Sequence, residues 1–159
     1  TVMEPALAYL MTSLLQDVVK EGTAQSLARF NWTRPTAGKT GTTNDGRDGW
    51  FVGYTPELLT GVWAGDDNFE AIGASGARDA VPLWAGFAKE VLMDYAETSF
   101  VRPEGLIEVL IDPVSGLKAV AGCPQKKQET FLAGTEPKEQ CPIHRRGLTG
   151  WFNRVFGKR

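Results

Sequence analysis

Apolar residues follow a helical period near the start of the chain. Leucine, methionine and valine recur every three or four positions over residues 5–20, which predicts an amphipathic helix. Pro5 suits the first turn of a helix, and Gly22 suits a position just beyond its end. The recurring positions are Leu7, Leu10, Met11, Leu14, Leu15, Val18 and Val19.

Three short segments of strand type follow after a polar linker. They cover residues 36–43, 50–54 and 58–64. Asn44-Asp45-Gly46 and Thr55-Pro56-Glu57 supply turns between them. Connections this short favour antiparallel neighbours, so we expect a meander of three strands.

A second amphipathic helix is predicted over residues 80–96, after a loop at 66–78. Asp79 is a candidate N-cap, and Pro82 fits the first turn. The apolar face of this helix would comprise Val81, Leu83, Trp84, Phe87, Val91 and Leu92.

A small hairpin is predicted beyond residue 100. Residues 106–111 and 117–120 are of strand type, with the turn Asp112-Pro113-Val114-Ser115-Gly116 between them. The chain is then polar and irregular until Gly147. These elements predict an α/β chain of the α+β kind, with an antiparallel sheet flanked by helices. We expect three parts, at residues 1–100, 101–143 and 144–159.

Composition and charge limit the classes of protein to which the chain could belong. The 159 residues are 42% hydrophobic, enough for one domain with a core, and the net charge of −2 gives no reason to expect a nucleic-acid partner. No apolar run reaches the roughly 20 residues of a membrane span. The first residues, 1–5, carry no signal peptide and read as an interior cut. We therefore expect any export signal or membrane anchor to lie upstream.

The last residues form a basic and aromatic tail. Trp151, Phe152 and Phe156 could share one side of a short helix, with basic residues around them. Such a helix could lie on an anionic membrane surface or dock a partner. The favoured interpretation is a frayed terminus.

Two cysteines, Cys123 and Cys141, are each followed by proline. In an oxidising compartment they could form a disulfide, which would stabilise the fold by roughly 3 kcal/mol in the chain-entropy model. Two unpaired thiols are an equal alternative. His144 could join both sulfurs in a metal site, but three ligands without a Cys-x-x-Cys pair fall short of one. We therefore expect no metal and no cofactor.

The segment Lys39-Thr40-Gly41-Thr42-Thr43 carries the candidate chemistry. An exposed strand edge can receive an extended peptide as a further strand. Gly41 lets a reacting carbonyl come close, Lys39 supplies a positive charge, and Thr40 and Thr42 place hydroxyls on one face. The N–H of Thr42 can stabilise an oxyanion. Such a strand would receive a peptide that ends in a carboxylate, although Lys-Thr-Gly alone also occurs by chance.

The flanks of this segment make the pattern specific. Ala37-Gly38-Lys39-Thr40-Gly41-Thr42-Thr43-Asn44-Asp45, followed by Asp48-Gly49-Trp50-Phe51-Val52-Gly53-Tyr54-Thr55-Pro56, closely resembles the transpeptidase domain of class A (bifunctional) penicillin-binding proteins. Residues 2–5, 18–24, 63–68, 111–117 and 134–137 resemble that family in the same order. The resemblance covers roughly residues 1–142.

The resemblance implies a penicilloyl-serine-transferase fold, here partial, in a periplasmic enzyme that cross-links peptidoglycan. A serine would attack a D-Ala-D-Ala stem peptide, and β-lactams would acylate the same serine. Lys39 and Thr42 would be catalytic, through electrostatic control of proton transfer and through the oxyanion hole. Thr40, Gly41, Thr42 and Thr43 would bind substrate.

The nucleophile of this family is missing from its expected place. Its Ser-x-x-Lys and Ser-x-Asn motifs precede Lys-Thr-Gly, and neither precedes it here. Ser115-Gly116-Leu117-Lys118 fits by letters but follows the motif, in a turn that would not place both side chains in one cleft. We therefore expect the serine on an upstream part of the same protein, and this chain to be inactive alone. A β-lactam sensor and a non-catalytic peptidoglycan-binding or scaffold module are the alternatives.

Other polar and aromatic residues favour ordinary roles. Asp66 and Asp67 follow the end of a strand, where adjacent side chains point to opposite faces, so we expect both in a solvated loop and not in a shared site. Asp45, Arg47 and Asp48 are expected in a polar turn at the mouth of the cleft. Trp50, Phe51, Tyr54, Trp63, Trp84 and Phe87 are expected in the core or in the wall of the cleft.

Overall fold

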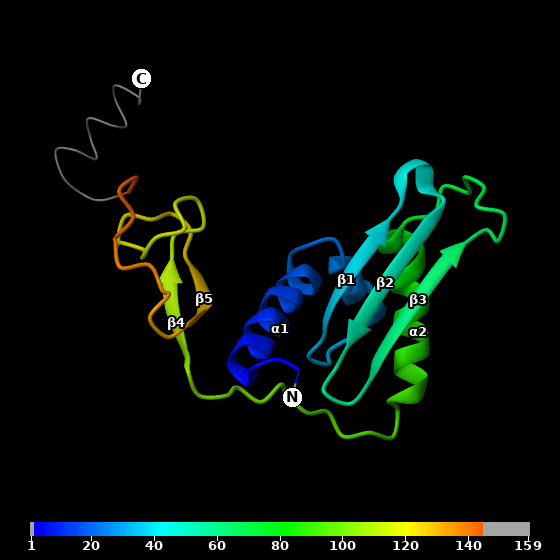
Figure 1. Cartoon of the computed structure of the whole chain (residues 1–159), viewed down its shortest axis with the longest axis horizontal. Helices are drawn as coiled ribbons and strands as arrows, with labels where there is room; N and C mark the ends of the chain where they lie inside the picture. The colour runs from blue at the N-terminus through cyan, green and yellow to red at the C-terminus, as the bar shows by residue number, and fades with distance from the viewer. Residues whose placement is uncertain (1, 145–159) are drawn as a thin grey trace. The chain divides into compact units, whose positions relative to one another are not determined.

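The computed structural model describes residues 2–144, which fall into two compact units (Figure 1). One unit contains residues 11–101, and the other contains the residues up to Leu10 and the chain from Arg102 onward. The predicted division into three parts stays a prediction, and the aromatic residues of the tail lie outside the described residues. The helices and strands are α1 (Pro5–Lys20), η1 (Gln25–Phe30), β1 (Ala37–Thr42), η2 (Asn44–Gly46), β2 (Asp48–Tyr54), β3 (Leu59–Gly65), η3 (Gly76–Ala80), α2 (Val81–Val91), β4 (Leu106–Ile111) and β5 (Lys127–Leu132).

The larger unit is built on a three-stranded antiparallel meander. The strand order is β1-β2-β3, so β1 and β3 are the two edges of this sheet. The turn between β1 and β2 is sharp because Asp45 and Gly46 both have a left-handed backbone, with φ of 64° and 63°. The predicted antiparallel sheet flanked by helices is confirmed.

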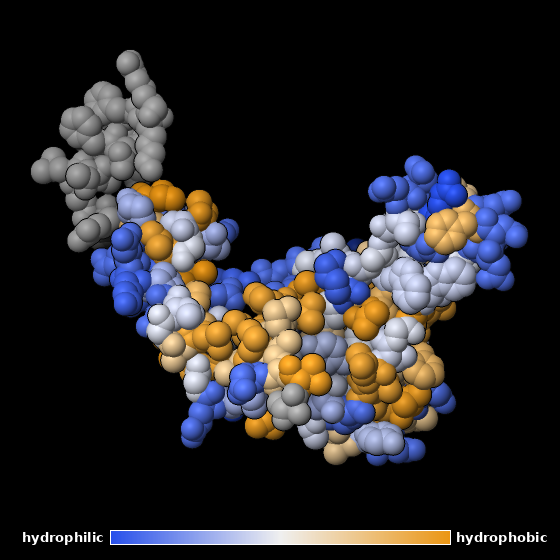
Figure 2. Space-filling view, in the orientation of Figure 1, coloured by the Kyte–Doolittle hydropathy of each residue, from blue (hydrophilic) through white to orange (hydrophobic). Residues whose placement is uncertain are grey.

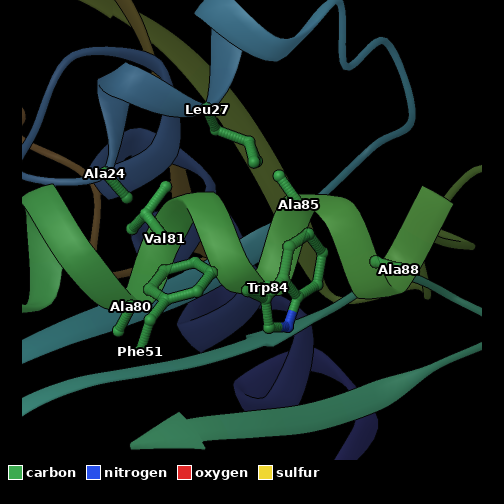
Figure 3. Packing of buried hydrophobic residues seen from close by; sticks show 8 residues of the cluster. All are labelled: Ala24, Leu27, Phe51, Ala80, Val81, Trp84, Ala85 and Ala88. Atoms are coloured by element: carbon green, nitrogen blue, oxygen red, sulfur yellow. The ribbon is translucent and has the colours of Figure 1, made fainter. Parts of the chain in front are cut away.

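The core of this unit lies between α2, η1 and the sheet. Figure 3 shows Phe51 of β2 and Trp84 of α2 in contact, with Leu27 of η1 near Ala85. The rings of Phe51 and Trp84 meet edge to face at 5.4 Å, and both are fully buried. The indole N–H of Trp84 donates to the carbonyls of Gly53 and Thr60 and so ties the helix to β2 and β3. The polar linker expected before β1 thus contains η1, a short helix that contributes to the core.

The second helix differs from its prediction in extent and in its inner face. It runs from Val81 to Val91, not from 80 to 96, and a turn of π-helix, η3, precedes it. Small residues, Ala85 and Ala88, are buried at the face where Phe87 and Leu83 were expected. Ala85 lies beside Leu27 of η1 (Figure 3), so a small side chain at this position lets neighbouring residues pack close to the helix.

Asp79 does not cap α2, contrary to prediction. Its Oδ2 accepts a hydrogen bond of 2.7 Å from the N–H of Ser75, so Asp79 instead closes the start of η3. The side-chain hydrogen bond from Arg78, followed by that from the Ser75 amide, holds the pKa of Asp79 below its ordinary value. Asp79 therefore fixes the segment that enters η3.

The smaller unit contains a two-stranded sheet with a different partner from the predicted one. Strand β4 pairs with β5, antiparallel, over residues that were expected to be irregular. Residues 117–120 contribute only isolated bridges, from Lys118 to Ile111 and to Gln140. Strand β5 is polar, and its cross-strand pairing outweighs the low strand propensity of lysine, glutamine and glutamate.

The helix α1 forms where the period of three and four predicted it, yet none of its residues is buried. Apolar side chains also remain exposed on α2, among them Leu83 and Phe87. Figure 2 shows apolar residues, in orange, open to the viewer in the middle of the picture, where Figure 1 draws α1. Among residues 2–144, no helix combines the length and the apolar character that a bilayer crossing requires.

Candidate active site

Strand β1 presents half of its backbone away from the sheet. The N–H of Thr43 donates to the carbonyl of Asp48 across the β1–β2 ladder at 3.1 Å. In an antiparallel pair, successive residues point their N–H and C=O groups alternately toward and away from the partner strand. The N–H groups of Thr42 and Thr40 and the carbonyl of Thr40 therefore point out of the edge. This edge carries the predicted Lys-Thr-Gly segment.

Lys39 extends along the same edge. Its side chain is exposed, and its Nζ donates to the carbonyl of Thr40 at 2.8 Å. That bond agrees with a Thr40 carbonyl that faces outward. The ammonium group is held beside the outward amides without an ion-pair partner among residues 2–144. A carboxylate that reaches the edge would therefore meet a positive charge that no described carboxylate neutralises.

The hydroxyls of Thr40 and Thr42 lie on one face of β1, as predicted. Thr40 is paired with the buried Phe51, so this face is the one that α2 and η1 cover. The Oγ1 of Thr40 lies 2.6 Å from that of Thr23, and the Oγ1 of Thr42 accepts a hydrogen bond from the N–H of Gly76 at 3.1 Å. Because the Thr42 oxygen accepts that bond, its own proton is available to a substrate.

Gly76, at the start of η3, lies against the backbones of β1 and β2. A Cβ at this position would come within 2.3 Å of the Trp50 carbonyl and 2.5 Å of the Gly41 carbonyl. Only glycine allows η3 to approach the backbones of β1 and β2 so closely. Asp79 holds the adjoining Ser75 amide, so it positions Thr42 through Ser75 and Gly76. No local signal in the sequence predicts this support, because its residues are far from the motif.

On the opposite face of β1, the lack of a side chain at Gly41 makes room for Trp50. A Cβ at this position would lie 3.2 Å from that of Trp50, a tight contact. Trp50 and its cross-strand partner Trp63 line this face, with ring centroids 6.4 Å apart. They are 45% and 40% exposed, so they form an open aromatic surface in this chain, whereas Phe51 belongs to the core.

Thr43 and Asp48 close the end of the site. The Oγ1 of Thr43 accepts a hydrogen bond from the N–H of Asp48 at 2.8 Å. Asp48 is buried, and its Oδ1 accepts from the indole N–H of Trp63 at 2.7 Å. It is thus a structural residue and not part of an ordinary polar turn, which corrects the prediction. The indole partner of Asp48 lies on β3, too far along the chain for a local sequence signal.

The remaining candidate residues lie partly in the larger unit and partly in the smaller one. Arg47 donates to the carbonyl of Phe69 at 2.7 Å and so ties the turn before β2 to the loop after β3. Asp66 accepts from the N–H of Asn68 and holds a local turn. Ser115 lies in the turn after β4, where its Oγ accepts from the N–H of Leu117. Ser115 and Lys118 belong to the smaller unit, whereas Lys39 belongs to the larger one.

The smaller unit matches a known protein family. The family model described as penicillin-binding protein 1A, C-terminal domain, matches residues 102–146. That match covers β4 and β5 and the turns around them.

Relatives with the same name match a larger part of the chain than the family model does. Penicillin-binding protein 1A of Pseudomonas aeruginosa is 40% identical over 132 residues, which are 82% of this chain and 16% of that protein. The protein of that name from Aquifex aeolicus is 40% identical over 130 residues, 80% of this chain and 18% of its own length. Each of these relatives is therefore several times longer than the part that the chain matches.

A solved structure agrees with these relatives. The crystal structure of penicillin-binding protein 1A from Haemophilus influenzae superposes with a TM-score of 0.76 at 32% identity. The superposition covers 88% of this chain and 22% of that one, and it confirms the predicted transpeptidase-like fold. The chain belongs to the penicillin-binding protein 1A family.

Proposed function

We propose that the chain supplies the Lys-Thr-Gly side of a D,D-transpeptidase active site that cross-links peptidoglycan outside the cytoplasm. The observation that carries the proposal is the outward edge of β1, where Lys39 and the Thr40 and Thr42 amides lie together. The shared family supports this function, since its relatives are named for binding penicillin.

The edge fits an extended peptide that ends in a carboxylate. The outward N–H and C=O of Thr40 can pair with the backbone of a D-Ala-D-Ala stem peptide as an added strand. The Lys39 ammonium and the hydroxyls of Thr40 and Thr42 would hold the terminal carboxylate through charge-assisted hydrogen bonds. A β-lactam, with its own carboxylate, would occupy the same groups. Thr43, whose hydroxyl already accepts from Asp48, would support the site through the turn.

The reaction also requires a serine, which we place on an upstream part of the same protein. Its Oγ would form an ester with the penultimate D-alanine carbonyl while the C–N bond to the last D-alanine breaks. The serine proton would pass through a base to the leaving amine. An amine of a second stem peptide would then displace the serine. The N–H of Thr42 would stabilise the negative oxygen in both steps.

A substitution at Lys39 tests this role in the assembled protein. We expect Lys39→Ala to slow acylation by a fluorescent penicillin by roughly 100-fold, since it removes a preorganised charge from the site. Lys89→Ala, at an exposed lysine of α2, is the matched control and should leave the rate unchanged. Equal acylation of the two variants, with equal melting temperatures, would refute the role of Lys39.

The acceptor step separates an enzyme from a sensor. A transpeptidase should transfer the acyl group to an added amine, such as a D-amino acid, and release product. A β-lactam sensor would acylate without transfer. A scaffold module would do neither, even when the upstream part is present.

A further inference from the structure

The smaller unit gathers four metal-binding side chains in one place. Asp112, Cys123, Cys141 and His144 each offer one ligand atom, and these atoms lie within 4.8 Å of one another. Asp112 is 1% exposed, Cys123 6% and Cys141 0%. The Nδ1 of His144 lies 2.8 Å from the Oδ2 of Asp112 and 3.5 Å from the Sγ of Cys141. The cluster is thus compact and largely closed to water.

These spacings fit one tetrahedral zinc ion. Zinc binds thiolate at about 2.3 Å and imidazole or carboxylate at about 2.0–2.2 Å, which separates neighbouring ligand atoms by about 3.3–3.8 Å. The 3.5 Å between the Sγ of Cys141 and the Nδ1 of His144 falls within this range. The 2.8 Å between His144 and Asp112 is a direct hydrogen bond, which would have to lengthen by roughly 0.5 Å to admit the ion. Two sulfurs and an imidazole favour zinc over the hard cations magnesium and calcium.

Backbone groups hold the ligands toward the centre. The Oδ1 of Asp112 accepts from the N–H groups of Val114 and Ser115, at 3.0 and 2.9 Å, which leaves Oδ2 to face the cluster. The N–H of Val120 donates to the Sγ of Cys123 at 3.3 Å. Such second contacts orient ligands in structural metal sites.

The chain also brings His144 close by a specific backbone feature. A Cβ on Gly122 would lie 2.3 Å from the carbonyl oxygen of His144, so only glycine permits this approach. Cys141 joins the same region through its N–H, which donates to the carbonyl of Lys118 at 2.8 Å. Three separate stretches, around residues 112, 120–123 and 141–144, therefore converge on the cluster.

The burial of the cluster favours a shared partner for its ligand atoms. The carboxylate of Asp112 is 1% exposed, and its Oδ2 lies 2.8 Å from the Nδ1 of His144. The buried sulfurs of Cys123 and Cys141 lie within 4.8 Å of the other ligand atoms. Polar groups buried in this way are costly unless bound partners offset the loss of water.

We propose that Asp112, Cys123, Cys141 and His144 bind one structural zinc ion that fixes the turns of the smaller unit. Both thiols would lose their protons to solvent on binding. The expectation of no metal rested on three visible ligands, and the fourth, Asp112, lies in the turn after β4. A disulfide between the cysteines would leave the carboxylate and the imidazole without a shared partner.

Metal content and cobalt substitution test the site in the full 159-residue chain. We expect about one zinc per chain after secretion into an oxidising compartment, and a tight 1:1 zinc titration of the reduced, metal-free protein. Cobalt should give the intense visible bands of tetrahedral coordination and sulfur-to-cobalt charge transfer. Asp112→Asn retains an oxygen that can accept from Val114 and Ser115 but loses the charge, so it should weaken zinc binding at least about tenfold.

Two controls make the outcome decisive. Glu139→Gln removes an exposed acid two residues from Cys141 and should leave zinc affinity unchanged. Cys141→Ser should remove the charge-transfer band. The site would be refuted by an intact mass that shows a Cys123–Cys141 disulfide without zinc, or by free thiols that bind no zinc. Binding that Asp112→Asn leaves intact would refute the four-ligand set.

Discussion

At the scale of single residues, Thr43 supports the end of the site through its hydroxyl. Thr43→Val removes the acceptor for the Asp48 N–H, and Asp48 is buried. We expect a loss of about 1–3 kcal/mol in the free energy of unfolding, because a buried donor is left unpaired. Thr43→Ser keeps the hydroxyl and should retain most of the stability in urea unfolding. Equal stability of the valine and serine variants would contradict this support.

Glu57 gives a dependence of stability on pH. Its Oε1 accepts from the hydroxyl and the N–H of Thr98, and the hydroxyl bond is the main cause that lowers the pKa of Glu57. A pKa that is lower in the folded state stabilises the fold above the pKa of the unfolded chain. That contribution is lost as the pH falls through the folded pKa. Urea unfolding across the acid range should therefore show a smaller pH dependence in Glu57→Gln, whereas Glu90→Gln on α2 should follow the parent chain.

The motif residues could be predicted from the sequence, but the residues that support them could not. Lys39, Thr40 and Thr42 follow from the sequence, because strand alternation and a short motif are local properties. No local signal predicts the role of Asp48, since its indole partner Trp63 becomes a neighbour only when β3 pairs with β2. The same holds for Asp112, whose place beside both cysteines and His144 depends on distant segments. Long-range partners give buried polar residues their roles.

At the scale of elements, periodicity predicted α1, the meander and β4, and packing decided the rest. The end of α2 at Val91 and the turn of π-helix before it have no periodic signature. Strand β5 is polar, so only its partner β4 identifies it. The buried face of α2 includes Val81 and Trp84, as predicted, but has Ala85 and Ala88 in place of Leu83 and Phe87. Hydrophobic patterns predict which elements exist more reliably than how closely they approach.

Two glycines of neighbouring elements should respond in opposite directions. Gly76→Ala places a methyl group against the carbonyls of Trp50 and Gly41, so we expect a loss of about 1–3 kcal/mol and weaker penicillin acylation in the assembled protein. Gly86 lies in α2, where an added Cβ would meet no neighbouring atom within 4 Å. Gly86→Ala should therefore stabilise the chain by roughly 0.5–1 kcal/mol. A stability series by thermal unfolding checks both, and equal effects would contradict the close packing at Gly76.

At the scale of the whole molecule, the chain spans a small part of the relatives it matches, between 16% and 20% of those from Pseudomonas aeruginosa, Aquifex aeolicus and Escherichia coli. In the function that we propose, the outward edge of β1 holds the carboxylate and the oxyanion, and an upstream part of the protein supplies the attacking serine. The family could be predicted from the flanks of Lys-Thr-Gly because they preserve residue types and order over most of the chain.

Labelling with a fluorescent penicillin tests the central claim most directly. The 159-residue chain is incubated alone and with the upstream part of its protein, and the products are separated by mass under denaturing conditions. We predict no labelled band from the chain alone. With the upstream part present, we predict label on that part only, reduced by Lys39→Ala. A covalent label on the 159-residue chain itself, lost in Ser115→Ala, would contradict the account.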